Sequence, residues 1–147
     1  MTRHVVIVGG GVIGSAIASF VLRDPAFRGT VSVVERDPTY ARASSALSAS
    51  SIRQQFSTAV NVEIGRYGIA FLRRIGEELA VGGERPDVGL VEPGYLFLAT
   101  AAGGRALERQ HAMQRSLGVD VALLDPAALA TRFPWLAVHD LAAGSLG

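Results

Sequence analysis

The chain has 147 residues, enough for one ordinary domain, and 49% of them are hydrophobic, so it can fill a core. Fourteen basic residues face 13 acidic ones, giving a net charge of +1, and no basic stripe interleaved with aromatics points to a nucleic-acid partner. The sequence contains no cysteine, which excludes disulfides, thiolate metal sites and a cysteine nucleophile within this stretch.

The beginning of the chain predicts a βαβ unit that binds an adenine dinucleotide. A short apolar strand over residues 4–8 runs directly into the glycine-rich segment 9–14, and a helix is expected over 15–23. A second apolar strand over 30–34 ends on Glu35. The pattern is G-x-G-x-x-G with a strand before it, a helix after it and an acid about 20 residues further on.

The residue types of this motif fit a pyrophosphate. Gly9 permits the tight turn out of the strand, Gly11 lets the ligand approach the helix N-terminus, and Gly14 lets the helix pack on the strand. The N–H groups near Val12 and Ile13 point at the ligand, and the helix dipole favours its negative charge.

The acid after the second strand narrows the choice of dinucleotide. Glu35 is expected to accept hydrogen bonds from the ribose hydroxyls, and its charge would repel a 2′-phosphate. NADP is therefore disfavoured, whereas NAD and FAD both stay open.

The middle of the chain predicts a serine-rich connection and a long helix. Residues 41–51 are small and rich in hydroxyl groups, as suits a backbone that passes close to a cofactor. A helix is expected over 57–80, where apolar residues recur every three or four positions and predict a buried stripe. This stripe consists of Val60, Ile64, Tyr67, Phe71, Ile75 and Leu79.

After the loop at 81–87, a predicted domain border, the pattern changes. Segments 89–92 and 95–99 flank Pro93-Gly94 and predict a β-hairpin. We then expect a helix over 105–117, a strand over 119–124, and a short helix that Asp125 caps and that ends near residue 132. The three histidines have no ligand spacing, so no metal site is predicted.

The predicted parallel sheet is incomplete. A doubly wound sheet needs about five or six strands, but only two are expected before residue 40, and the uncharged end at 141–147 carries no cap. We therefore expect the chain to be the N-terminal piece of a longer protein. The first strand leaves no room for a signal peptide, and no apolar run reaches the ~18 residues of a membrane span. These features predict a cytoplasmic protein.

Several segments taken together resemble the FAD-dependent amine and amino-acid oxidoreductases, which include D-amino-acid oxidase, sarcosine oxidase, dimethylglycine dehydrogenase and glycine oxidase. They are Val-Val-Ile-Val-Gly-Gly-Gly-Val-Ile-Gly, Val-Val-Glu-Arg, the serine-rich run into Ile-Arg-Gln, and Gly-Tyr-Leu-Phe-Leu-Ala with the segments after it. The resemblance implies that residues 1–85 are the N-terminal part of a discontinuous FAD-binding domain. Residues 86–147 would begin an α+β substrate domain.

The resemblance also implies roles for individual residues. The intact enzyme would oxidise an amine or amino acid by hydride transfer to the flavin, with FAD held non-covalently because the segment lacks a histidine for attachment. Arg53 would place positive charge near the flavin. The implied cofactor-binding residues are Gly9, Gly11, Val12, Ile13, Gly14, Glu35, Arg36, Ser44, Ser45, Ser50, Ser51, Ile52 and Arg53.

Two other functions stay open. The chain could be an FAD-binding subunit whose sheet is completed by a partner chain, or part of an NAD-dependent dehydrogenase. Where many members of the family have Gly-Gly before Ile-Arg, this chain has Ser50-Ser51, so the approach of the backbone to the flavin differs there. The substrate and the catalytic residues are not identified by the sequence.

Overall fold

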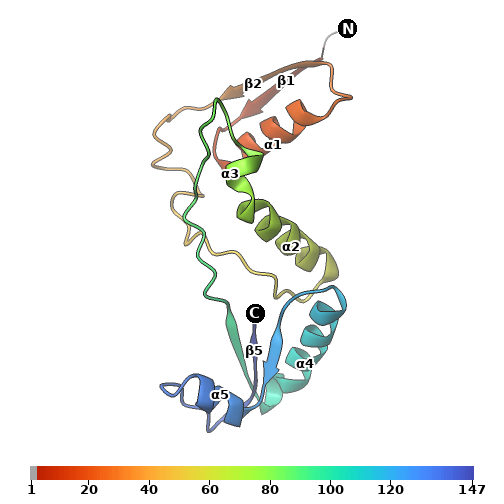
Figure 1. The fold of residues 1–147 in the computed structure, drawn as a ribbon, viewed down its shortest axis with the longest axis vertical. Helices are drawn as coiled ribbons and strands as arrows, with labels where there is room; N and C mark the ends of the chain where they lie inside the picture. The colour runs from red at the N-terminus through yellow and green to blue at the C-terminus, as the bar shows by residue number, and fades with distance from the viewer. Residues whose placement is uncertain (1–2) are drawn as a thin grey trace. The chain divides into compact units, whose positions relative to one another are not determined.

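The computed structural model describes residues 3–147. The chain divides into two compact units, Met1–Ser51 and Ile52–Gly147, and most of their helices and strands are labelled in Figure 1. The first unit contains a parallel strand pair and the second an antiparallel sheet. This arrangement confirms the predicted α/β unit followed by an α+β region.

The first unit is a βαβ arrangement. Strand β1 (Arg3–Val8) leads into helix α1 (Val12–Arg23), and strand β2 (Gly29–Val34) returns to pair with β1 in parallel, from Arg3 opposite Gly29 to Val8 opposite Val34. Helix α1 lies along one face of this strand pair (Figure 1). The helix begins three residues earlier than predicted because Gly11 is its N-cap.

The two faces of the β1–β2 pair differ in exposure. Ile7 is buried, whereas its neighbours Val6 and Val8 point to the other face, where they are 55% and 88% exposed. Alternate strand residues face opposite sides of a sheet, so the face of this pair that carries Val6 and Val8 is open to solvent.

The long helix predicted over 57–80 forms as two helices. Helix α2 (Ala59–Arg73) is followed by a single turn, α3 (Ile75–Glu78). Arg74 separates them with non-helical backbone angles, φ −112° and ψ 10°. The nearby Gly76 weakens the helix, because glycine costs about 1 kcal/mol relative to alanine in a helix interior.

The predicted buried stripe is wrong over its first half, whereas Phe71, Ile75 and Leu79 are half-buried. Val60, Ile64 and Tyr67 are all more than half exposed, and the buried residues of the helix are Val62 and Gly65. The apolar spacing located the helix correctly but did not identify the face that packs.

The predicted β-hairpin is also wrong. The structure places no strand at 89–92, where the Asp87 carboxylate accepts the Gly89 N–H at 2.8 Å in a turn. Strand β3 (Leu96–Thr100) pairs instead with β5 (Leu141–Leu146), which lies in the uncharged segment 141–147. The other neighbour of β5 is β4 (Ala122–Leu124), so β5 is the middle strand of an antiparallel sheet.

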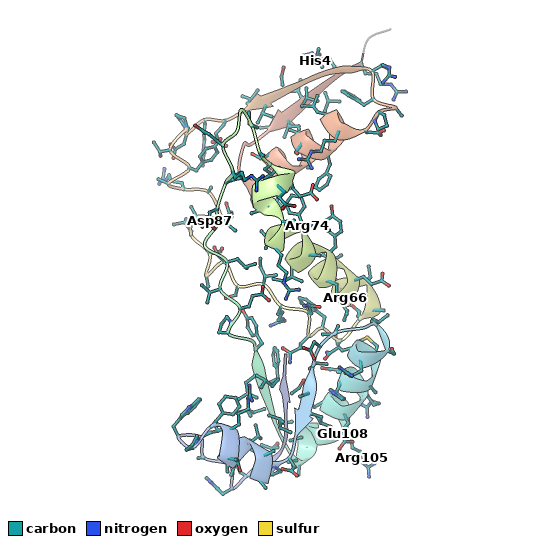
Figure 2. All side chains as sticks on the ribbon, in the orientation of Figure 1. His4, Arg66, Arg74, Asp87, Arg105 and Glu108 are labelled. Atoms are coloured by element: carbon teal, nitrogen blue, oxygen red, sulfur yellow. The ribbon has the colours of Figure 1, made fainter. Side chains whose placement is uncertain are left out.

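Two helices accompany this sheet. Helix α4 (Ala101–Ser116) packs on β5, with Gly104 and Gln114 buried, whereas Arg105 and Glu108 point into solvent (Figure 2). Helix α5 (Pro126–Arg132) begins as predicted, because the Asp125 carboxylate accepts the Ala128 N–H at 2.8 Å.

The core of the second unit gathers around α2 and the segment before β4. Val62 contacts Val119 and Val121, with Phe56, Met113 and Leu117 around them. Leu129 of α5 is fully buried over Gly144 of β5, where a Cβ would lie 2.8 Å from a leucine methyl carbon. Glycine in β5 therefore makes room for the leucine.

Within residues 3–147, no helix combines the length and the apolar character needed to cross a membrane. Nor does any cluster of three or more His, Cys, Asp or Glu side chains in this range have an arrangement that could hold a metal ion.

Candidate functional site: a glycine turn with an anchored acid

The turn between β1 and α1 has the backbone geometry that the motif predicts. Gly9 has φ +99°, a conformation that residues with a Cβ rarely adopt, and its N–H donates to Val34 O at 2.8 Å. A Cβ on Gly14 would lie 1.9 Å from Gly9 O, so only glycine fits where the helix crosses the turn. The turn and the first part of α1 are thereby fixed against the end of β2.

Space is open where a pyrophosphate would approach. Among the described residues nothing lies within 4 Å of a Cβ built on Gly9, and one built on Gly11 meets only Ala43 Cβ, at 3.9 Å. Gly11 is the N-cap of α1, and no side chain caps the helix by a hydrogen bond. Val12 and Ile13, the first two residues of α1, are 62% and 71% exposed. An anion at this position would meet backbone N–H groups and the favourable end of the helix dipole.

Glu35 is anchored to this turn by both carboxylate oxygens. Oε2 accepts the Gly10 N–H at 2.7 Å, and Oε1 accepts the Asp37 N–H at 2.9 Å. These bonds, first from Asp37 and then from Gly10, lower the pKa of Glu35 below its ordinary value. The carboxylate is therefore ionised at neutral pH and keeps lone pairs free for ribose hydroxyls.

Sequence reasoning missed two residues that hold the turn. Gly10 donates to Glu35, and its carbonyl accepts the Ser15 hydroxyl at 2.7 Å. The available signals were a third glycine inside the motif and a hydroxyl residue directly after its last glycine.

The predicted serines after β2 lie in a series of turns. Ser45 is half-buried and Ser44 exposed, and the Ser45 carbonyl accepts the Ser48 hydroxyl at 3.0 Å. Ser50 has φ +50°, and its N–H donates to Ser48 Oγ at 3.1 Å. Arg36, directly after the anchored acid, is exposed. Ser44 and Ser45 follow Ala43, whose contact with the Gly11 position brings this connection close to the glycine turn.

The first unit thus brings the glycine turn, Glu35 and the start of the serine-rich connection together. Ser51 is its last residue, whereas Ile52 and Arg53 belong to the second unit.

In the second unit, the backbone after Ile52 is held from several sides. A Cβ on Gly65 of α2 would lie 2.5 Å from Arg53 O, so the helix and this segment are in close contact. The buried Gln55 side chain donates to Ser145 O at 3.1 Å, and Gln114 donates to Phe56 O at 3.0 Å. The segment is fixed to α2, α4 and β5 at once.

The Arg53 side chain lies over aromatic rings. Its guanidinium carbon is 4.8 Å from the centre of the Phe56 ring and 5.3 Å from that of Phe97 on β3. Within residues 3–147, no acidic side chain forms an ion pair with Arg53. Two cation–π contacts therefore hold an exposed positive charge without neutralising it.

Comparison with known proteins agrees with this geometry. Residues 4–146 match the family model described as FAD dependent oxidoreductase. A Xenopus laevis protein named FAD-dependent oxidoreductase domain-containing protein 1 is 45% identical over 146 residues, and a Drosophila melanogaster homologue is 36% identical over 144. Each alignment covers 97% of this chain, which spans 29% of the Xenopus protein and 27% of the Drosophila one.

Solved structures share the fold. L-proline dehydrogenase from P. horikoshii matches 99% of this chain with a TM-score of 0.76 at 24% identity, over 36% of its own length. Glycine oxidase from Geobacillus kaustophilus matches 99% of this chain with a TM-score of 0.62 at 27% identity, over 39% of its own length. With the family match spanning nearly the whole sequence, the chain belongs to the FAD-dependent oxidoreductases and corresponds to their N-terminal, FAD-binding region.

Proposed function

We propose that this chain is the FAD-binding part of an enzyme that oxidises an amine or an amino acid. The observation that carries the proposal is the turn at Gly9–Gly14, open at Gly11 and tied to an ionised Glu35. When bound, the flavin supplies the hydride acceptor for a substrate C–H bond next to nitrogen. The similarity to the glycine oxidase of Geobacillus kaustophilus supports an amino-acid or amine substrate.

In this proposal the first unit binds the dinucleotide without a covalent bond. Gly9, Gly11 and Gly14 shape the turn, and the N–H groups at Val12 and Ile13 face the pyrophosphate. The remaining contacts in the first unit come from Glu35 at the ribose, Arg36 beside the adenine, Ser44 and Ser45 near the pyrophosphate, and Ser50 and Ser51 on the way to the flavin.

We propose that Ile52 and Arg53 pass the flavin ring and that Arg53 presents its charge there. A fixed cation stabilises negative charge that develops on a reduced flavin. The two aromatic contacts of Arg53 and the three-sided attachment of its backbone support this role, because a charge held in one place gives a constant electrostatic effect.

The domain organisation and the compartment stay predictions. We propose that residues 1–85 belong to the FAD-binding domain and that 86–147 begin the substrate-binding domain of the whole protein. The boundary between the two compact units falls earlier in the sequence, between Ser51 and Ile52. The predicted cytoplasmic location also stays a prediction.

The family match favours FAD over NAD as the dinucleotide. Absorbance of the purified full natural polypeptide distinguishes them, because a flavoprotein is yellow and an NAD-binding protein is not. The subunit alternative predicts a separate partner polypeptide, which mass spectrometry of the purified holoprotein would detect.

The site is tested by Gly11→Val in the full natural polypeptide. Because a Cβ at this position meets only Ala43, the variant should fold, but its side chain would occupy the pyrophosphate cradle. We expect FAD binding to be lost in a titration followed by flavin fluorescence, with an unchanged circular dichroism spectrum.

Gly68→Val is the matched control, because a Cβ on Gly68 of α2 meets no described atom within 4 Å. This variant should bind FAD as the wild type does. Wild-type FAD affinity in Gly11→Val would refute the placement of the pyrophosphate.

A further inference from the structure

Tyr40 occupies an unusual backbone position directly after the acid. Its φ is +56°, in the left-handed region that side chains with a Cβ rarely adopt and bulky residues adopt least. The turn around it is well bonded: the Tyr40 N–H donates to Asp37 O at 3.0 Å, and its carbonyl accepts the Ala43 N–H at 2.9 Å. A bulky residue in such a conformation persists only where its surroundings hold it, and it is found most often at functional sites.

The turn aims the Tyr40 side chain at the glycine motif. A Cβ built on Gly10 would lie 3.1 Å from the Tyr40 hydroxyl oxygen, 3.5 Å from a carbon of its ring and 3.3 Å from Glu35 Cβ. The tyrosine and the acid therefore meet at the same glycine. Gly10 occupies a variable position of G-x-G-x-x-G, so its lack of a side chain is explained here by Tyr40 and Glu35 and not by the motif.

Tyr40 remains partly open to a ligand. The residue is 42% exposed, and within the described range its hydroxyl makes no hydrogen bond. A phenol offers an apolar face and a hydrogen-bonding tip, a combination suited to a nucleoside.

We propose that Tyr40 is a further cofactor-binding residue that contacts the adenosine half of the FAD. The inference rests on the proposed function, in which Glu35 holds the adenosine ribose. Because Tyr40 adjoins Glu35 at Gly10, its ring covers the nucleoside and its hydroxyl hydrogen-bonds with the ribose. The strained turn is kept because it brings the ring to that place.

Two substitutions distinguish the contributions of the turn, the aromatic ring and the hydroxyl group to binding. Tyr40→Asn keeps the turn, since asparagine tolerates the left-handed conformation, but removes the ring. Tyr40→Phe keeps the ring and removes the hydroxyl. Both are made in the full natural polypeptide, and its apo form is titrated with FAD and with AMP, which represents the adenosine end alone.

We expect Tyr40→Asn to reduce the affinities for FAD and for AMP by the same factor, about tenfold, as loss of an aromatic stacking contact does. Tyr40→Phe should weaken both by about threefold, as loss of one neutral hydrogen bond does. The thermal midpoint of the apo protein should stay the same or rise in Tyr40→Asn, because a strained residue is relieved. A purely structural tyrosine would give the opposite pattern, a lower midpoint with unchanged affinity of the folded protein.

The inference is overturned if both ligands bind Tyr40→Asn with wild-type affinity. It is also overturned if the affinity for FAD falls while the affinity for AMP does not. The Gly11→Val variant distinguishes a wrong role for Tyr40 from a wrong proposed function. If Gly11→Val loses FAD and Tyr40→Asn does not weaken it, only the role of Tyr40 is wrong. If Gly11→Val binds FAD normally, the site itself is wrong.

Discussion

The two units of this chain are each stabilised by different kinds of interaction. In the first, a parallel strand pair leaves Val6 and Val8 exposed, and the glycine turn is fixed by backbone hydrogen bonds and by Glu35. In the second, Val62 and Leu129 are fully buried and the sheet is covered by helices. A binding turn can thus be specified by a few backbone and carboxylate hydrogen bonds to the end of β2, whereas the core of the second unit is specified by side-chain packing.

The largest effect is expected from removing a core side chain in the second unit. Leu129→Ala should reduce the free energy of unfolding of that unit by about 2–5 kcal/mol, because it leaves a cavity over Gly144. Hydrogen exchange followed by mass spectrometry should show faster exchange in β4, β5 and α5 and wild-type exchange in residues 9–14. Leu123→Ala is the control, since Leu123 is 39% exposed and should cost much less. Equal loss of protection in both units would show that they are not independent.

A smaller effect is expected from adding one methyl group in the first unit. Gly14→Ala places a Cβ against Gly9 O, so the helix must shift, and we expect a loss of about 1–3 kcal/mol in that unit. Exchange should rise at β1, α1 and β2, and FAD affinity should fall with it. Gly68→Ala, in open space on α2, should be neutral or stabilising. A Gly14→Ala protein with wild-type exchange and affinity would contradict the crowding at this crossing.

The smallest effect is a difference in pH dependence. Because the folded state lowers the pKa of Glu35 below 4.5, its bonds to Gly10 and Asp37 stabilise the first unit above that pH and are lost as the pH falls below it. Protection at residues 9–14 should therefore drop below about pH 4.5 in the wild type. Glu35→Gln should lack this step, whereas Glu63→Gln on α2 should retain it. A step that persists in Glu35→Gln would assign it to another group.

The same contrast explains what could be predicted from the sequence. The glycine turn, the acid after β2 and the Asp125 cap belong to motifs with characteristic residue types and spacing, and all of them formed at the predicted positions. The predicted hairpin does not form because β3 pairs with β5, roughly 40 to 50 positions further along the chain, and local turn residues carry no information on that pairing.

The prediction of the packed face of α2 was wrong for a related reason. Val62 is buried by Val119 and Val121, which arrive from beyond α4, so the apolar spacing within α2 could not identify its partner. In the candidate site, the contacts of Gly10 with Tyr40 depend on a left-handed turn that the segment Asp-Pro-Thr-Tyr does not announce. The cofactor-binding assignments beyond the turn came from family resemblance and stay predictions.

The position of β5 has a consequence for biosynthesis. A chain leaves the ribosome from its N-terminus, so β1 and β2 can pair as soon as Val34 is free. The middle strand of the second sheet is made last, and β3 and β4 stay unpaired until residues 141–146 have emerged. The nascent polypeptide therefore carries a finished glycine turn while its apolar strand edges remain open to chaperones.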